Sequence, residues 1–248
     1  MYIRLEHGIY MVGGGAGGPG ISHYKDCNVY LIEGKSDAFL IDGGSGLDTE
    51  WILRNISEAG CAREKIRYLF LTHAHGDHGG GVKGLKEAMP WITIVASSGE
   101  KRLLEEGSEE ELGLVAAKKK GAYPKDYVYP HCQVDLTAED GQCFFVADSK
   151  VTVVLVPGHS VESALYLLDK DRKRYLFSGD SIYLNGVLSL INCYGSTMEG
   201  YRNHIHKLAG RGIDALIPSH YRLTLTGGQK HIDKAIEMLG YSSLPPMM

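Results

Sequence analysis

A cluster of potential metal ligands lies in the stretch Thr-His-Ala-His-Gly-Asp-His, which runs from Thr72 to His78. It places three imidazoles and one carboxylate within six positions, at His73, His75, Asp77 and His78. Neutral imidazole and carboxylate are donors that zinc, iron and manganese take in proteins. A single histidine near a strand end is usually structural, but four ligand-type side chains packed this closely predict a metal site.

Three further positions share one pattern, in which a short apolar run ends in a turn residue and then a potential ligand. They are His159 after the run 151–156, Asp180 after the run 174–177 and His220 after the run 213–217. One such residue would be weak evidence, because His and Asp at strand ends often serve as turn residues or caps. Together, ligands at the ends of neighbouring strands are expected to converge on one edge of a rigid frame.

These positions give the motif H-x-H-x-D-H, then a later His, a later Asp and a final His, and on this motif the chain resembles the metallo-β-lactamase superfamily. All seven positions match, and their order and spacing cover the chain from about residue 2 to residue 240. The resemblance implies an α/β fold, the four-layer αββα sandwich, as a single domain over residues 1–248. It also implies a two-metal site between the sheet edges.

The resemblance further implies two sets of three ligands and one bridging carboxylate. One metal ion would be held by His73, His75 and His159, the other by Asp77, His78 and His220, and Asp180 would bridge both. The expected cofactors are two divalent metal ions, zinc first. Iron and manganese stay open, because seven His and Asp ligands admit all three metals.

Two metal ions and one open coordination position predict hydrolysis. Coordination lowers the pKa of bound water toward ~7 and so gives a hydroxide nucleophile, while the second cation polarises the scissile carbonyl or phosphoryl oxygen. Asp77 would lie beside that water and move a proton to the leaving group. Asp42, in Ile-Asp-Gly-Gly, matches a family loop near the metals, and we assign it the orientation of a ligating imidazole. A plain turn aspartate is the alternative.

Tyr183 stands three residues after Asp180, in Asp-Ser-Ile-Tyr, and is similar to a tyrosine of the N-acyl homoserine lactonase branch. There the matching phenol donates a hydrogen bond to the substrate carbonyl or leaving oxygen, so the resemblance implies a catalytic role beside Asp77. A packed aromatic is the alternative. Asp180 stands where the B1 and B2 β-lactamases carry a cysteine, which argues against those classes. Glu162 departs from the glycine common in glyoxalase II-like members.

The predicted function is a dinuclear metal-dependent hydrolase that acts on a small ester, thioester or lactone. A phosphodiesterase is the alternative among hydrolases, because the same metals serve phosphoryl transfer. From another class, an iron persulfide dioxygenase keeps much of this ligand set but loads one iron and activates O₂. A metal-binding protein with lost or regulatory activity is a third alternative, against which the intact ligands argue.

The composition fits a soluble protein with a small-molecule substrate. Of 248 residues, 44% are apolar and 23% charged, and the net charge of −4 leaves no basic footprint for nucleic acid. No apolar stretch approaches the ~20 residues of a membrane span, and the first residues lack a signal-peptide core. Five cysteines without metal-type spacing are expected to be reduced, mostly buried thiols in a cytoplasmic protein. The sequence is compatible with a homodimer but contains no pattern that predicts the oligomeric state.

Apolar periodicity predicts the elements that position the ligands. Strands are expected at 2–5, 9–12, 28–33, 38–42, 66–71, 91–96, 151–156, 164–168, 174–177 and 213–217. Helices are expected at 48–59, 82–89, 108–120, 198–209 and 231–239. The third begins at the capping box Ser-Glu-Glu-Glu and ends on three lysines, which complement the helix dipole. Strands with interspersed helices fit a layered α/β protein.

Two glycine-rich segments have predicted roles. The glycines at 76, 79, 80 and 81 are expected to turn the ligand loop, so that a loop rather than a strand aims the ligands inward. The tract 13–20 holds a formal G-x-G-x-x-G but does not open a helix, which argues against a dinucleotide site. We interpret it as a flap near the metal edge, with His23 and Tyr24 touching substrate, and a disordered surface loop is the alternative. Substrate specificity is expected in the loops 13–24, 97–132 and 183–196.

Overall fold

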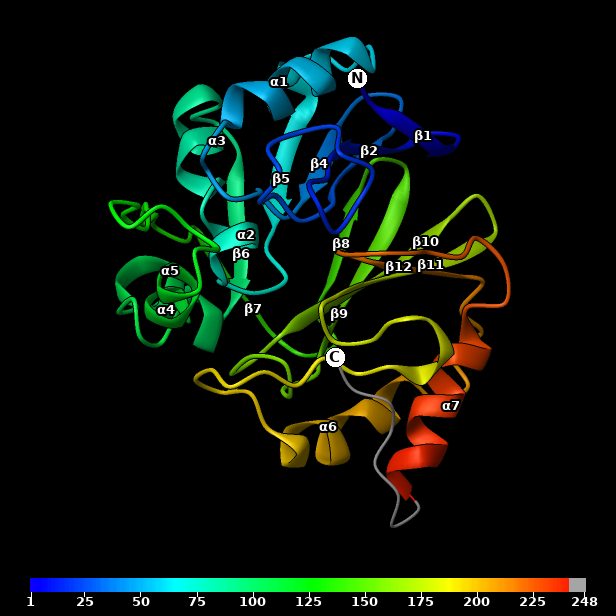
Figure 1. Cartoon of the computed structure of the whole chain (residues 1–248). Helices are drawn as coiled ribbons and strands as arrows, with labels where there is room; N and C mark the ends of the chain where they lie inside the picture. The colour runs from blue at the N-terminus through cyan, green and yellow to red at the C-terminus, as the bar shows by residue number, and fades with distance from the viewer. Residues whose placement is uncertain (241–248) are drawn as a thin grey trace.

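Two β-sheets pack face to face in the computed structural model, which describes residues 1–240 (Figure 1). The first sheet has the strand order β1-β2-β3-β4-β5-β6-β7 and the second has the order β12-β11-β10-β9-β8. The strands of the first are β1 (Ile3–Glu6), β2 (Ile9–Gly13), β3 (Val29–Glu33), β4 (Ala38–Ile41), β5 (Ile66–Phe70), β6 (Thr93–Ser97) and β7 (Leu136–Ala138). Those of the second are β8 (Cys143–Val146), β9 (Ser149–Leu155), β10 (Ala164–Lys170), β11 (Lys173–Gly179) and β12 (Ala215–Pro218).

Helices lie on the outer faces of the two sheets and along one edge of the sandwich. They are α1 (Thr49–Glu58), α2 (Gly76–Gly79), α3 (Val82–Ala88), α4 (Ser98–Glu106), α5 (Leu114–Lys119), α6 (Met198–His204) and α7 (Gln229–Gly240), with 3₁₀ turns at Arg63–Lys65, Leu184–Gly186 and Ile205–Leu208. The helices α1, α3 and α4 pack on the first sheet, while α6 and α7 pack on the second, at the far end of the molecule in Figure 1. The four layers form the predicted αββα sandwich.

Alternating side chains on each strand divide the interior into three apolar layers. Along β3, Leu31 faces the helices of the first sheet, whereas Tyr30 and Ile32 face the second sheet. In the second sheet, Leu176 faces α6 and α7, and its neighbour Phe177 faces the first sheet. Because side chains in a strand alternate with period two, a sheet covered on both faces must be apolar in both registers. This explains the continuous apolar runs in the sequence.

Strand pairing places the ligand-bearing strand ends at one edge, and parallel pairs account for those of β5, β11 and β12. Strand β5 pairs in parallel with β4 and β6, and β11 pairs in parallel with β12. Neighbouring parallel strands end at the same edge of a sheet, so the segments that follow them leave close together. Between the sheets, the Phe70 ring at the end of β5 lies 5.0–5.3 Å from the rings of Phe39, Phe144 and Tyr166. Each such pair contributes about 0.5–1.5 kcal/mol beyond its buried area.

The structure corrects part of the element prediction. The capping box at 108–120 forms its hydrogen bonds, with Ser108 and Glu111 each donating a backbone N–H to the other's side chain. Gly113 then takes a left-handed φ of 71°, so the chain turns and only the short α5 follows. The prediction of one helix over 108–120 was therefore wrong. It also omitted α4, β7 and β8, and the helix predicted at 198–209 is α6 followed by a 3₁₀ turn.

Other sequence predictions have mixed outcomes. Within residues 1–240, no helix combines the length and apolar content that crossing a bilayer requires. The five cysteines are unpaired thiols, of which Cys27, Cys61 and Cys132 are buried and Cys143 is exposed. The predictions of a single domain and of a cytoplasmic location stay predictions, and residues 241–248 of that domain lie outside the described residues.

Candidate metal centre

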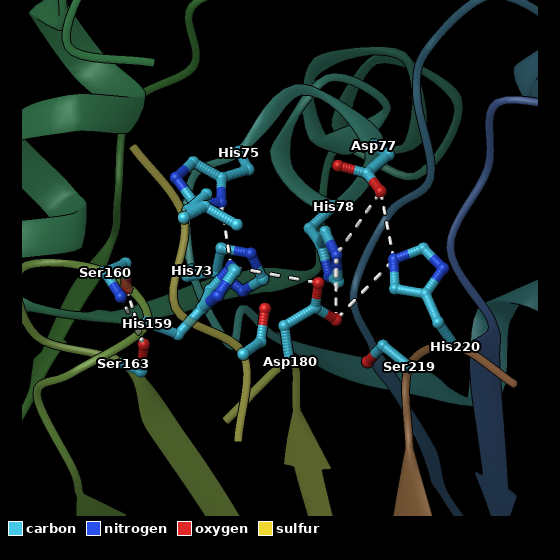
Figure 2. A network of polar contacts seen from close by, with 12 residues as sticks. His73, His75, Asp77, His78, His159, Ser160, Ser163, Asp180, Ser219 and His220 are labelled. Atoms are coloured by element: carbon cyan, nitrogen blue, oxygen red, sulfur yellow. Dashed lines mark hydrogen bonds and ion pairs between the residues drawn. The ribbon is translucent and has the colours of Figure 1, made fainter. Parts of the chain in front are cut away.

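The seven predicted ligands meet at one edge of the sandwich, although they come from four separate segments (Figure 2). Four of them follow β5, and the others follow β9, β11 and β12. The ligand atoms form overlapping trios in which all atoms lie within 4.8 Å of one another. The strand ends therefore bring these side chains together, and their role as metal ligands stays a prediction.

The segment after β5 differs from the expected loop. Asp77 and His78 lie on the one-turn helix α2, whose first residue follows His75. None of the four glycines in this segment has a positive φ, so the turn does not require their backbone freedom. They are required by close packing instead, because a Cβ at Gly81 would lie 1.9 Å from the Gly43 oxygen and one at Gly79 would lie 2.2 Å from the Tyr129 hydroxyl.

One trio consists of His73, His75 and His159. The Nδ1 atom of His75 lies 3.0 Å from Nε2 of His159, and the ring of His73 lies 4.6 Å from the ring of His75 and 4.7 Å from that of His159. The first two residues come from the first sheet and the third from the second sheet. This half of the centre therefore bridges the two sheets.

The other trio consists of Asp77, His78 and His220. Nε2 of His220 lies 3.0 Å from Oδ2 of Asp77, and Nε2 of His78 lies 3.6 Å from the same oxygen. These two contacts are drawn as dashed lines in Figure 2. This half also joins the sheets, because His220 follows β12.

Asp180 lies between the two trios and presents one carboxylate oxygen to each. Its Oδ2 lies 3.7 Å from Nε2 of His159, whereas Oδ1 lies 3.5 Å from Nε2 of both His78 and His220. A carboxylate in this position can contact ions in both trios at once.

Buried polar atoms without partners show that the centre fits divalent metal ions. Nε2 of His73, Nε2 of His78 and Oδ1 of Asp180 are buried and have no hydrogen-bond partner within residues 1–240. Leaving such atoms unsatisfied costs about 1–3 kcal/mol each. Nitrogen and carboxylate oxygen donors aimed at a shared space are what zinc, iron or manganese needs.

The two trios differ in their electrostatics. Burial, together with the neighbouring imidazoles, lowers the pKa of His73 well below its usual range, and burial beside His159 lowers the pKa of His75 to about 3. Burial alone would also lower the pKa of His220, but Asp180 and Asp77 outweigh it and raise that pKa. Imidazoles must be neutral to bind a metal, and burial favours the neutral form of His73 and His75.

Asp42 holds His78 in place from behind. This fully buried carboxylate lies 2.9 Å from Nδ1 of His78 through Oδ2, and it accepts hydrogen bonds from the Thr72 backbone N–H at 2.8 Å and the Ser219 hydroxyl at 3.0 Å. An N–H donated by Nδ1 leaves the Nε2 lone pair directed at the centre, which fixes the tautomer that a ligand needs. These contacts support the predicted role of Asp42 in orienting a ligating imidazole.

A cavity of about 620 Å³ opens onto the metal centre. Its floor includes His75, Asp77, His159, Asp180 and His220. Its walls are mostly apolar and come from the segment 112–123, which includes α5, and from the segment 183–193. Such a pocket, apolar with a few convergent polar groups, is typical of small-molecule sites.

Tyr183 lines this cavity and its hydroxyl is free to donate. The side chain is buried, and its hydroxyl has no hydrogen-bond partner among the described residues. Burial raises the pKa of the phenol well above its usual value, and the charge of Asp180 acts in the same direction. The phenol is therefore protonated at neutral pH.

The glycine tract lies at the metal edge, as predicted, but it is tightly packed. Backbone hydrogen bonds join Gly15 to Asp26 at 2.9 Å and Ala16 to Tyr24 at 2.8 Å. A Cβ at Gly17 would lie 2.7 Å from Nδ1 of His220. The disordered-loop alternative does not fit these contacts, while a flap motion stays a prediction.

His23 and Tyr24 do not line the cavities described at this edge. Instead, residues 16–18 line a second cavity of about 680 Å³, which shares Tyr183 and Tyr221 with the first. The loops 97–132 and 183–196 do supply the main cavity walls.

The sequence analysis did not single out several residues of the main cavity. Tyr123 lines it with a second buried, unpartnered hydroxyl, and Lys120 places a cation among its lining residues. From sequence alone, the lysines at 118–120 are interpreted only as a helix end. Their place at the C-terminal end of α5 carries no sequence signal for a cavity, because only the fold brings α5 over the metal edge.

Comparison with known sequences gives a consistent picture. A model of the metallo-beta-lactamase superfamily matches residues 25–220. The lactamase-like protein nscB of Neosartorya fischeri is 30% identical over 204 residues, which are 82% of this chain and 51% of that protein. The acyl-coenzyme A thioesterase MBLAC2 of Bos taurus is 27% identical over 214 residues, covering 78% of this chain and 72% of that protein. The chain thus spans about half the length of the nscB proteins that it matches.

Solved structures share the fold. The metallo-beta-lactamase GOB-18 of Elizabethkingia meningoseptica superposes with a TM-score of 0.72 over 96% of this chain and 89% of that one, at 20% sequence identity. At 20% identity, this similarity supports the αββα architecture alone, and the chemistry has to be argued from the residues of the site. The family match, the architecture and the seven converging ligands lead to one conclusion: this chain belongs to the metallo-beta-lactamase superfamily.

Proposed function

We propose that the protein is a dinuclear metal-dependent hydrolase that acts on a small ester, thioester or lactone. The observation that carries this proposal is Asp180, whose two oxygens face two separate ligand trios. A centre built for one ion would need only one of these trios.

Each trio would hold one divalent cation, most simply zinc. His73, His75 and His159 would hold the first, Asp77, His78 and His220 the second, and Asp180 would contact both. When bound, the two cations would supply a water of lowered pKa and polarise the acyl oxygen.

The protein's own side chains would then direct the hydrolysis. The water oxygen bonds to the acyl carbon, and the bond from that carbon to the leaving oxygen or sulfur breaks. Asp77, partly exposed at the cavity floor, accepts the proton of the water and passes it to the leaving atom. Tyr183 donates its hydroxyl to the oxygen that gains charge.

The cavity favours an acyl substrate with an apolar part. Leu112, Leu114 and Ile191 line it with the aliphatic surface that would hold such a group. The similarity to a protein named acyl-coenzyme A thioesterase supports a thioester among the three bond types. The substrate class is therefore testable with matched pairs of esters, thioesters and lactones.

Replacement of Tyr183 by Phe is expected to lower kcat for the acyl substrate by about 10-fold or more, because one oxyanion donor is lost. KM should change little, since the ring and its packing against Tyr221 remain. Steady-state kinetics of the two proteins at equal metal content measure this. Unchanged kcat in Tyr183→Phe would return Tyr183 to a packing role.

The function itself is tested by a substrate screen on protein reconstituted with zinc or manganese. Hydrolysis of a thioester, ester or lactone at least 100-fold faster than that of bis(p-nitrophenyl) phosphate supports the proposal. Preference for the phosphodiester would select the phosphodiesterase alternative. Oxygen uptake with glutathione persulfide by the iron-loaded protein would select the dioxygenase.

A further inference from the structure

Glu100 is a carboxylate outside the ligand set that is fully buried beside the metal centre. It lies in the first turn of α4, on the outer side of the first sheet. Charged side chains are almost never fully buried unless other groups satisfy them. The hydrogen bonds of Glu100 therefore identify the groups that compensate for its burial.

The two oxygens of Glu100 bind two different ligand segments. Oε2 accepts the backbone N–H of Ala74 at 2.8 Å, and Ala74 lies between His73 and His75. Oε1 accepts the Ser160 hydroxyl at 2.6 Å and the backbone N–H of Glu162 at 3.1 Å. Ser160 directly follows the third histidine of the same trio, His159.

Both ends of this connection are themselves fixed. The Ala74 carbonyl accepts the hydroxyl of Tyr129 at 2.8 Å, so the residue between the two histidines is held through both its N–H and its C=O. On the other segment, the Ser160 backbone N–H donates to the Ser163 hydroxyl at 3.2 Å, and the Ser160 and Ser163 hydroxyls also contact each other (Figure 2).

We propose that Glu100 is the positioning residue for the trio His73, His75 and His159. By binding the segment after β5 with one oxygen and the segment after β9 with the other, it sets the separation of ligands that come from opposite sheets. The 3.0 Å approach of His75 to His159 depends on that separation. This inference rests on the proposed metal centre but concerns only one of its two trios.

A carboxylate is required at this position because three donors point at it. In Glu100→Gln, the amide group can keep its oxygen toward Ser160 and Glu162, but its NH₂ then faces the Ala74 N–H. With the amide reversed, the NH₂ faces the Glu162 N–H. Either orientation sets one N–H against another, so one of the two segments is released.

The test is a zinc competition titration of the full-length apoprotein against a chelator, with wild type, Glu100→Gln and the same change in a His220→Ala background. We expect the wild type to bind two equivalents. In Glu100→Gln, one equivalent should bind 10- to 100-fold more weakly and the other should be unchanged within 3-fold. In the His220→Ala background, which keeps the three-histidine trio, the single remaining equivalent should show the same 10- to 100-fold loss.

Asp26→Asn is the matched control for removing a buried carboxylate. Asp26 is 3% exposed, and its side chain accepts the Ser45 backbone N–H at 2.8 Å rather than binding a ligand segment. It should lose thermal stability while both zinc equivalents bind as in wild type. Should Glu100→Gln not fold, Ser160→Ala removes one of the two contacts to Oε1 and is expected to weaken the same equivalent by at least 3-fold.

Equal zinc affinities in Glu100→Gln and wild type would overturn the positioning role. The same holds if Glu100→Gln and Asp26→Asn weaken both equivalents alike, because the effect would then be general. A wild type that binds one equivalent contradicts the dinuclear proposal instead. In that case, the zinc affinity of the single equivalent in Glu100→Gln, compared with that in wild type, still decides the positioning role.

Discussion

Asp180→Asn is expected to reduce kcat/KM on the order of 10³-fold, whichever acyl substrate is used. The two carboxylate oxygens lie 3.5–3.7 Å from imidazole nitrogens of both trios, and an amide can offer only its oxygen to one of them. One trio then loses its contact with an oxygen of residue 180, and the NH₂ group of the asparagine faces the metal ion there instead. The loss should therefore appear both in turnover and in metal content, which should fall from two equivalents toward one.

Metal analysis and steady-state kinetics on the same preparation check this expectation. Asp169→Asn is the control, because Asp169 lies on β10 and pairs with Arg174 away from the centre. It should retain both metal ions and full activity. An Asp180→Asn protein with two metal ions and wild-type turnover would contradict the bridging role of Asp180.

Asp42→Asn is expected to weaken zinc binding at the trio Asp77, His78 and His220 by 10- to 100-fold and to lower the free energy of unfolding by about 1–3 kcal/mol. The carboxylate accepts from Thr72, Ser219 and Nδ1 of His78, so it satisfies buried donors from both sheets. Asn donates an N–H where the carboxylate accepted one. The His78 proton would then move to Nε2 and occupy the lone pair that the metal needs.

Asparagine is the informative replacement because residue 42 has a φ of 63°, a left-handed conformation that Asn tolerates and Ala does not. Ser219→Ala is the matched control, since it removes one donor to Asp42 and leaves His78 in place. Zinc competition and urea unfolding measure both effects. If zinc affinity in Asp42→Asn equals that in Ser219→Ala, Asp42 serves only the fold.

The sequence predicted which side chains converge, because metal chemistry restricts residue type and the strand ends restrict position. His159, Asp180 and His220 each follow an apolar run. Strands β11 and β12 pair in parallel, and β9 and β11 both pair antiparallel with β10, so all three strands end at one edge. The layers were also predictable, because buried sheets need apolar runs. Here the local sequence and the tertiary structure impose the same requirement.

The rest depended on contacts between distant residues. Glu100 stands in the charged stretch Ser-Gly-Glu-Lys-Arg, which has the composition of an exposed helix, and nothing local shows that its carboxylate meets Ala74 and Ser160. Because a glutamate takes one of the buried positions of α4, the sequence of this helix lacks a complete apolar stripe from which it could have been predicted. Gly79 and Gly81 are predicted from sequence to allow a turn. The structure shows that glycine is needed there because Tyr129 and Gly43 leave no room for a side chain.

The most direct test of the central claim is the metal content per chain, measured by mass spectrometry on protein purified without added metal. A dinuclear hydrolase built on two trios and Asp180 predicts close to two equivalents of zinc, manganese or a mixture. One equivalent of iron, with O₂ consumed on a persulfide substrate, would contradict it.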